Sequence, residues 1–369
     1  MDNKINLLFS ARDIASGYSI INLINFFKKK KIYNISVISS FPASKLLSAH
    51  LSKGISHTVI KENYTNQNKF IRFLTKFIEK KKSNFLITGL SGPDKSIDEA
   101  LIFICKKKNI YSFSYQDFCG DINFGYGVLP DCYLVTDQLS SKITKKISKK
   151  KTIIVGHLNY KNLNLNFKKK KIMNRVLFCG QPLSFLNGYQ KTIIELVNAL
   201  KKQKKHFTFS YRPHPKEKKI FLNNLSKKFN KLDIDFSFSK EKILYKDLYS
   251  SKYVISCYSS SIMDLSILKN NYNLKYPNSL CLLFNKDIKK YYKDYTRLNF
   301  LPYDRMKLTK TVYFKKDLNR YLKKLLDNKF NIPQFKNLRT IFEIKKSSLE
   351  KLNKYIMNQH DKNCNIHKE

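Results

Sequence analysis

Tryptophan is absent from these 369 residues, and glycine and proline are scarce, with 10 and 9 copies. No apolar run reaches the ~18 residues that span a bilayer. The start, MDNKINLLFS, has neither the basic beginning nor the long apolar stretch of a signal peptide. The seven cysteines include no CxxC pair. We therefore expect a cytoplasmic protein with reduced, buried thiols and no zinc site.

Acidic residues are also few, 27 against 71 lysines and arginines, which gives a net charge of +44. Such a charge is typical of proteins that bind nucleic acid or anionic membranes. The lysines, however, are spread along the chain in short runs such as Lys28–Lys31 and Lys168–Lys171. We therefore expect no nucleic-acid partner, and a peripheral contact with the anionic inner membrane stays open. A non-catalytic, charge-driven nucleic-acid-binding protein is the alternative from another functional class.

Length and hydrophobic content suit two domains rather than one. Short apolar runs alternate with helical stretches, which predicts parallel sheets covered by helices on both faces. The fold class predicted is α/β, with two tandem Rossmann-like domains, an interdomain cleft and C-terminal helices. The expected parts are an acceptor domain at 1–158, a linker at 159–171, a donor domain at 172–334, and a C-terminal helix and tail at 335–369.

The individual elements follow from the same alternation. Strands are expected at Ile5–Phe9, Tyr33–Ser39, Phe85–Thr88, Ile110–Tyr115, Cys132–Thr136, Thr152–Val155, Arg175–Cys179, Phe207–Tyr211, Ile234–Phe236 and Tyr253–Cys257. Helices are expected at Ser16–Lys29, Ser44–Lys53, Ser96–Lys107, Tyr189–Lys202, Lys216–Phe229, Glu241–Ser250, Ser261–Lys269, Lys315–Leu326 and Leu338–Met357. The pattern over Tyr276–Met306 predicts no definite element.

The strongest local motif is Tyr211-Arg-Pro-His-Pro215, which follows a predicted strand and precedes a predicted helix. That position places Arg212 and His214 beside a helix N-terminus, where free amides and the helix dipole favour anions. Arginine offers a planar fork that suits phosphate, and the two prolines stiffen the loop. The motif indicates a phosphate site, with a simple turn carrying a surface Arg and His as the alternative.

A second signal is the cluster Ser259, Ser260 and Ser261, again after a strand and at a helix start. Hydroxyls and helix-start amides together can cradle a phosphate, although any one of these serines could instead cap the helix. Both signals end strands of the same predicted sheet. Together they indicate one site for the phosphate of a nucleotide.

The order of Leu177-Phe-Cys-Gly-Gln-Pro-Leu183, the Arg-Pro-His-Pro motif and the serine cluster resembles a family. It is similar to the C-terminal domain of bacterial lipooligosaccharide sialyltransferases and polysialyltransferases, and to capsule Kdo and CDP-glycerol transferases. These are GT-B enzymes. The resemblance covers roughly residues 172–270. It implies that His214 and Ser259–Ser261 contact the CMP phosphate, with Gly180 and Gln181 in the same site.

The N-terminal half lacks the acidic-acidic-Gly tripeptide that carries the catalytic base in those sialyltransferases. Asp13 and Asp94 each follow a predicted strand, and either could take a proton from an acceptor hydroxyl. We favour Asp13 and expect Asp94 to cap a helix. Arg12 is a candidate for binding an acidic acceptor. His157 is interpreted as a structural residue close to the hinge.

The sequence therefore predicts a metal-independent GT-B glycosyltransferase that needs no cofactor. The expected donor is a CMP-activated acidic sugar, either a sialic-acid-type nonulosonate or Kdo. The expected acceptor is a lipid-linked glycan of the lipopolysaccharide or capsule. Alternatives are a CDP-glycerol-type polyol phosphotransferase, a UDP-GlcNAc 2-epimerase-like enzyme, and an inactive GT-B protein.

Overall fold

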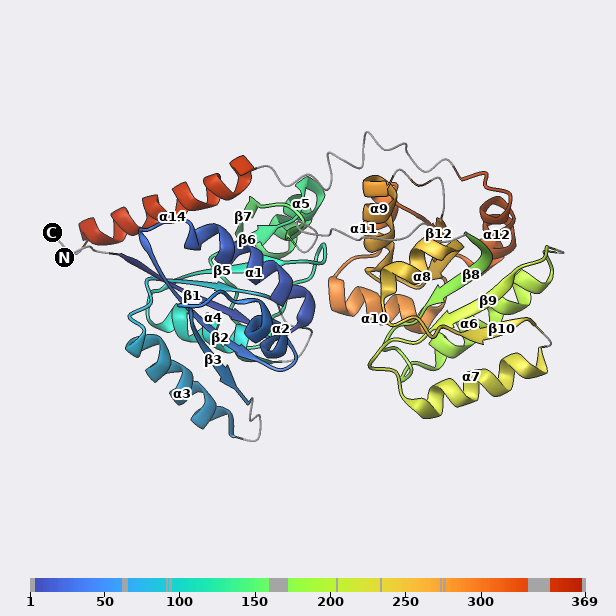
Figure 1. Ribbon diagram of the computed structural model, residues 1–369, viewed down its shortest axis with the longest axis horizontal. Coiled ribbons are helices and arrows are strands. Elements are labelled where there is room, and N and C mark those ends of the chain that lie inside the picture. The colour runs from blue at the N-terminus through green and yellow to red at the C-terminus, as the bar shows by residue number, and fades with distance from the viewer. Residues whose placement is uncertain are drawn as a thin grey trace. The chain divides into compact units, whose positions relative to one another are not determined.

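The chain folds into two compact units, of which one is discontinuous in sequence. Unit 1 comprises Met1–Leu163 and Phe342–Glu369, and unit 2 comprises Asn164–Ile341. The structure is a computed structural model (Figure 1). It describes residues 4–61, 66–90, 92, 95–158, 172–203, 205–232, 234–272, 274, 277–330 and 346–366. The predicted linker at 159–171 lies outside the described residues.

Unit 1 is built on a parallel sheet with the strand order β3-β2-β1-β4-β5-β6-β7. Its first strand alternates faces as a buried strand must, since Leu7 and Phe9 pack into one core and Leu8 into the other. The strands are β1 (Ile5–Ala11), β2 (Tyr33–Ser40), β3 (Ser56–Ile60), β4 (Phe85–Thr88), β5 (Tyr111–Gln116), β6 (Cys132–Val135) and β7 (Lys151–Ile154).

Helices cover both faces of this sheet, as parallel sheets require. The helices are α1 (Ile14–Lys28), α2 (Ala43–His50), α3 (Gln67–Lys80), α4 (Ile97–Lys107), α5 (Gln138–Ser148) and α14 (Lys346–Ile366). The core on one side contains residues of α1 and α2, and the core on the other side residues of α3 and α4.

The helix α14 belongs to unit 1 although it follows unit 2 in the chain (Figure 1). Leu349, Leu352 and Ile356 are buried in the same core as α1. At the surface, Lys30 Nζ pairs with Glu350 Oε2 at 2.9 Å. The predicted C-terminal helix is therefore part of the N-terminal unit's core and runs further, to Ile366, than the expected end at Met357.

Unit 2 repeats the architecture with the strand order β10-β9-β8-β11-β12-β13, all parallel. The strands are β8 (Met173–Cys179), β9 (Thr208–Arg212), β10 (Phe236–Phe238), β11 (Ser251–Ser256), β12 (Asn278–Leu282) and β13 (Lys310–Val312). The helices are α6 (Asn187–Lys201), α7 (Lys219–Lys231), α8 (Leu244–Ser250), α9 (Ser261–Tyr272), α10 (Lys286–Thr296), α11 (Pro302–Arg305) and α12 (Leu318–Leu326).

Most predicted elements are present within a few residues, which confirms the α/β fold class. The region over Tyr276–Met306, for which the pattern predicted nothing, contains β12, α10 and α11. The expected helix start at Lys315 is a short 3-10 turn, Lys315–Asp317, and α12 follows it.

Of the seven cysteines, all are free and six are buried, with Cys364 exposed. In the part of the chain that the structure describes, no helix is long and apolar enough to cross a membrane.

Candidate functional site

The candidate site in unit 2 lies at the carboxyl ends of three neighbouring strands. In the sheet, β8 lies between β9 and β11, so the loops after these strands emerge side by side. They carry the predicted residues Gly180 and Gln181 after β8, Arg212 and His214 at the end of β9, and the serines after β11. The order of connections reverses between β8 and β11, and such switch points are where doubly wound sheets bind ligands.

Gln181 ties the loops together across this switch point. Its side-chain Oε1 accepts a hydrogen bond from the backbone amide of Tyr258 at 2.9 Å. Its own backbone amide donates to the Tyr189 hydroxyl at 2.8 Å. Gln181 is only 6% exposed. We therefore interpret Gln181 as a brace between two loops, which leaves its predicted contact with substrate untested.

His214 is held in one tautomer by its own loop. Its Nδ1 lies 3.1 Å from the backbone nitrogen of Lys216, which can only donate. Nδ1 must therefore be unprotonated, and in the neutral ring the proton is on Nε2. Burial, helped by the charge of Lys216, lowers the pKa of His214 to about 4. The loop thus presents a neutral imidazole with an Nε2–H donor.

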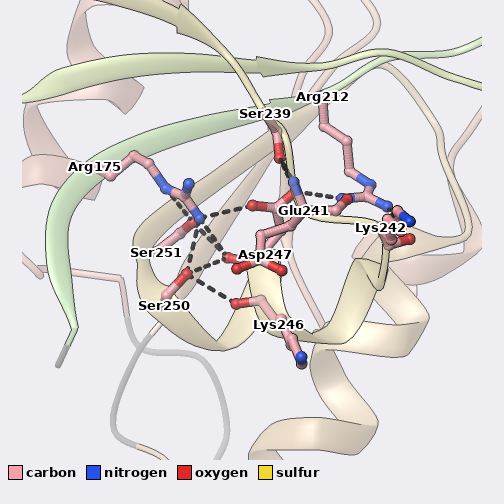
Figure 2. A network of polar contacts seen from close by, with 9 residues as sticks. All are labelled: Arg175, Arg212, Ser239, Glu241, Lys242, Lys246, Asp247, Ser250 and Ser251. Carbon is pink, nitrogen blue, oxygen red and sulfur yellow. Dashed lines mark hydrogen bonds and ion pairs between the residues drawn. The ribbon is translucent and has the colours of Figure 1, made fainter. Parts of the chain in front are cut away.

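Arg212 is engaged by the protein rather than held ready for a ligand (Figure 2). Its Nη1 donates to a carboxylate oxygen of Asp247 and, at 2.7 Å, to the carbonyl of Glu241. Its Nη2 donates to the carbonyl of Lys242 at 3.2 Å. These contacts fix the loop that follows β10 against the end of β9. The proposed contact of Arg212 with phosphate therefore competes with an existing network.

Asp247 is the centre of that network and is fully buried (Figure 2). Arg175 approaches its other carboxylate oxygen at 3.1 Å and also donates to Ser250 Oγ and Ser251 Oγ. A buried carboxylate needs such partners, because an unpaired charge in the interior is costly. The sequence analysis missed this residue, because an acid next to Lys246 on the short helix α8 looks like an ordinary surface residue.

The three serines differ in their surroundings. The carbonyl of Ser260 accepts the first helical bonds of α9, from Met263 and Asp264 at 2.8 and 3.1 Å. Ser259 Oγ accepts the backbone amide of Ser261 at 3.2 Å. Ser260 is exposed, whereas Ser261 is only 3% exposed. Ser259 and Ser260 therefore lie where a ligand at the start of α9 can be reached, and Ser261 packs into the unit.

Glu217 is a residue of this edge that the sequence analysis missed. Its Oε1 accepts the Tyr211 hydroxyl at 2.6 Å, and its Oε2 accepts the backbone amide of His214 at 2.6 Å. Burial outweighs these hydrogen bonds and raises the pKa of Glu217 to about 7. The available signal was an acid three positions after the histidine, in the same loop.

The corresponding edge of unit 1 carries Asp13. The sheet order reverses between β1 and β4, and Asp13 Oδ2 accepts the amide of Gly92, after β4, at 3.0 Å. A side chain at Gly89 would place its Cβ 2.5 Å from Ser16 Cβ, so glycine is required where α1 packs against this loop. Asp94, the other base candidate, lies outside the described residues.

Asp117, at the end of β5, lies close to Asp13. Burial, with a smaller contribution from the charge of Asp13, raises the pKa of Asp117 to about 6 against the backbone amides that lower it. In the sequence, Asp117 lies in a polar loop that could line a cleft but suggests no chemistry, because the shift of its pKa comes mainly from burial, which the fold creates. The charge of Asp13 and the raised pKa of Asp117 thus place two interacting carboxyl groups at this edge of unit 1.

Two more acids of unit 1 are buried at the start of α4. Ser10 Oγ donates to Asp98 Oδ1 at 2.5 Å, and Ser96 Oγ donates to Glu99 Oε2 at 2.5 Å. Both acids lie in the first turn of α4, where the helix dipole favours negative charge. His157 is buried, with Nε2 3.6 Å from Asp137 Oδ2, a position that suits the predicted structural role.

No protein-family model matches the chain, and no curated protein sequence does either. Solved structures do match. The Staphylococcus aureus MnaA–UDP structure superposes with a TM-score of 0.65 at 12% identity, over 96% of this chain and 97% of that one. The Neisseria meningitidis UDP-GlcNAc 2-epimerase bound to UDP-GlcNAc gives 0.60 at 10% identity, over 96% and 100%. A glycosyltransferase from Rickettsia africae gives 0.60 at 11%, over 96% and 98%.

These matches cover nearly the whole chain, and at such low identity they establish the fold alone. The chain has the GT-B fold, as the sequence predicted. The particular resemblance to sialyltransferases and Kdo transferases stays a prediction.

Proposed function

We propose that this GT-B chain is a glycosyltransferase whose unit 2 binds a nucleotide-sugar donor and whose unit 1 activates the acceptor. The preferred donor is a CMP-activated acidic sugar, a sialic-acid-type nonulosonate or Kdo, and the acceptor is a cell-surface, lipid-linked glycan. The observation that carries the proposal is the neutral His214 of unit 2. The ring proton of His214 is on Nε2. Its loop follows β9, which only β8 separates from β11, the strand that leads into α9.

In the donor unit, His214 Nε2–H, the Ser259 and Ser260 hydroxyls and the start of α9 would bind the phosphate of the donor. As the bond from the sugar to this phosphate breaks, negative charge grows on the phosphate oxygen, and these donors stabilise it. Since Arg212 is engaged by Asp247 and two carbonyls, we propose that it acts mainly by holding the loop.

In the acceptor unit, Asp13 would remove the proton from the acceptor hydroxyl as the hydroxyl oxygen attacks the anomeric carbon. Asp117 is the natural partner of Asp13 in this step, because the two carboxyl groups interact and the pKa of Asp117 is raised to about 6. Arg12, directly before Asp13, is proposed to bind an acidic group of the acceptor.

A second candidate is an enzyme resembling a UDP-GlcNAc 2-epimerase. The observation in its favour is that two of the matching structures, those of S. aureus and N. meningitidis, contain UDP or UDP-GlcNAc. The same donor edge would then hold a UDP-sugar. The nucleotide base separates the two candidates.

The deciding experiment is a thermal-shift screen against CMP, CDP, UDP, GDP and their sugars, with the wild type, His214→Ala and His206→Ala. A ligand at 100 times its Kd stabilises by ~2.7 kcal/mol, which gives a clear shift. His206 is exposed in the same unit, before β9, and serves as the matched control. We expect a shift with a cytidine nucleotide that His214→Ala loses and His206→Ala keeps.

Selective stabilisation by UDP would favour the epimerase-like candidate, and product analysis with UDP-GlcNAc would test it directly. No shift with any nucleotide, or an equal shift in wild type and His214→Ala, would reject the donor site. In the transfer assay, His214→Ala should reduce turnover sharply. Near-normal turnover would contradict the role of His214.

A further inference from the structure

A chain of hydroxyl groups runs beneath the His214 loop and ends on Glu217. The backbone amide of Gln181 donates to the Tyr189 hydroxyl at 2.8 Å. The hydroxyls of Tyr189 and Tyr211 are 3.1 Å apart, and the Tyr211 hydroxyl donates to Glu217 Oε1 at 2.6 Å. A carboxylate can only accept, so Tyr189 must donate to Tyr211 and every donor points towards Glu217. Hydrogen bonds aligned in this way strengthen one another.

The second oxygen of Glu217 holds the loop itself. Oε2 accepts the backbone amide of His214 at 2.6 Å, and the amide of Glu217 returns a bond to the His214 carbonyl at 2.9 Å. The site is tightly packed, since a Cβ at Gly180 would lie 2.5 Å from Glu217 Oε2 and 2.8 Å from the Tyr211 hydroxyl. The carboxylate therefore has little freedom to turn towards other partners.

We propose that Glu217 is a positioning residue, whose ionised carboxylate holds the His214 loop in the shape that binds the donor phosphate. This inference rests on the proposed function of unit 2. The carboxylate itself need not touch the ligand. It acts through His214, whose backbone it fixes while the Lys216 amide fixes the ring.

Protonation of Glu217 breaks this arrangement whichever oxygen takes the proton. A proton on Oε2 faces the His214 amide, and two donors then meet. A proton on Oε1 faces the Tyr211 hydroxyl, which must reverse. The reversed chain leaves the Tyr189 proton without its acceptor, because the Gln181 amide cannot accept. The neutral acid thus loses at least one of the bonds that the ionised form makes, and leaving a buried donor unpaired is unfavourable.

Glu217 is also the group here that titrates near neutral pH. The titratable groups that face it are Tyr211 of β9, Tyr189 of α6, Cys257 after β11 and His214 of its own loop. Burial raises the pKa of both tyrosines and of the thiol well above their usual values, and lowers that of His214 to about 4. Of these described groups, Glu217 alone changes charge around pH 7.

The sign of the effect on stability is opposite to that on binding. Because the pKa of Glu217 is raised from 4.5 to about 7, the folded protein binds this proton more tightly than the unfolded chain. The contribution of Glu217 to the unfolding free energy therefore falls as pH rises through this window. If Glu217 had a structural role alone, its ionised form would favour both the stability of the fold and the binding of the nucleotide. A functional carboxylate can instead favour binding at a cost in stability.

The test compares wild type with Glu217→Gln, which resembles the neutral acid. Kd for CMP is measured by calorimetry at about pH 6 and about pH 8, with melting temperatures in parallel. The phosphate of CMP also titrates in this range and affects both proteins alike. The ratio of the variant's Kd to the wild-type Kd at each pH therefore isolates the effect of Glu217. We expect the variant to bind about 10-fold more weakly at the higher pH and within about 2-fold at the lower. Its melting temperature relative to wild type should rise with pH.

Tyr211→Phe provides an independent variant. It removes a hydrogen bond that lowers the pKa of Glu217, so the pH at which binding weakens should move upward. A Kd ratio that is the same at both pH values, in either variant, would overturn the positioning role.

The His214 backbone amide, observed by NMR with 15N-labelled histidine, separates this inference from the proposed function. A step in its shift near pH 7 in wild type that is absent in Glu217→Gln supports the loop mechanism. If that step is present but no nucleotide binds, the proposed function fails, while the hold of the Glu217 carboxylate on the His214 loop is still supported. If the step is absent, the positioning role fails even when nucleotide binds.

Discussion

The two units use the same layout at their carboxyl edges and fill it with opposite chemistry. In each, the second residue after the central strand reaches across the switch point to a backbone amide: Asp13 to Gly92 in unit 1, and Gln181 to Tyr258 in unit 2. The side chain that accepts is charged in one unit and neutral in the other. The two units thus share the same contact between a side chain and a backbone amide, although the charge of the accepting side chain differs.

The groups around each switch point extend this contrast. Unit 1 has Asp117 close to Asp13, and two further acids are buried at the start of α4. Unit 2 surrounds Gln181 with His214, the serines and the start of α9. An acidic edge suits the removal of a proton, and an edge rich in hydrogen-bond donors suits a phosphate.

The largest expected effect is the loss of turnover when Asp13 is replaced, which tests the difference between the two edges. Asp13→Asn keeps an oxygen for the Gly92 amide but cannot take a proton, so turnover should fall by ~10²–10⁴-fold. Binding of the nucleotide by unit 2 should change by less than about 2-fold, because the substitution lies in the other unit. Transfer assays and calorimetry on the same preparation measure both quantities.

The matched control is Asp131→Asn. Asp131 accepts the amide of Ser112 at 2.9 Å, near the start of β5 and so at the opposite edge of the same sheet. We expect full activity in this variant. Equal losses of turnover in the two variants, or no loss in Asp13→Asn, would contradict a catalytic role for the acidic edge.

The next effect concerns how unit 2 stabilises its edge. Asp247→Ala leaves Arg175 and Arg212 without their buried carboxylate, so the unfolding free energy should fall by about 3–5 kcal/mol. Asp317→Ala removes a surface pair with Arg320 and should cost about 1 kcal/mol at most. Urea unfolding followed by circular dichroism compares the two. Similar losses would show that the network in Figure 2 is no stronger than a surface contact.

The smallest effect is a pH dependence in unit 1. The pKa of Asp117 is raised from 3.8 to about 6, so the folded state holds this proton more tightly and loses stability as pH rises between these values. Asp117→Asn should remove that slope, with a difference of at most about 3 kcal/mol across the window. Thermal melts at several pH values provide the measurement, and parallel curves would contradict it.

Much of this molecule could be predicted from local patterns. Apolar strands alternating with helices predicted both sheets, and the position of the Arg-Pro-His-Pro motif after a strand predicted its place at the carboxyl edge. These inferences succeed because strand periodicity and strand ends are properties of short segments. The predicted site residues of unit 2 consequently gather at one edge.

The remaining features depend on contacts between distant segments. The sequence indicates that Arg212 is a phosphate ligand, but Asp247, which pairs with it, lies on α8, 35 positions further along the chain. Glu217 and Asp117 look like ordinary surface acids, because their raised pKa values arise from burial, which folding alone creates. The place of α14 was likewise unpredictable, since an amphipathic helix does not specify which core covers its apolar face.

The return of α14 to unit 1 also fixes an order of events during synthesis. Unit 2 is one continuous stretch, Asn164–Ile341, and can fold once that stretch has left the ribosome. Unit 1 must wait for Leu349, Leu352 and Ile356 to close its core. At ~5–20 residues per second, the intervening segment takes on the order of 10–40 s to make. During that time one apolar surface of the N-terminal half stays uncovered for chaperones, so a nonsense codon between the codons of unit 2 and those of α14 damages the half that was translated first.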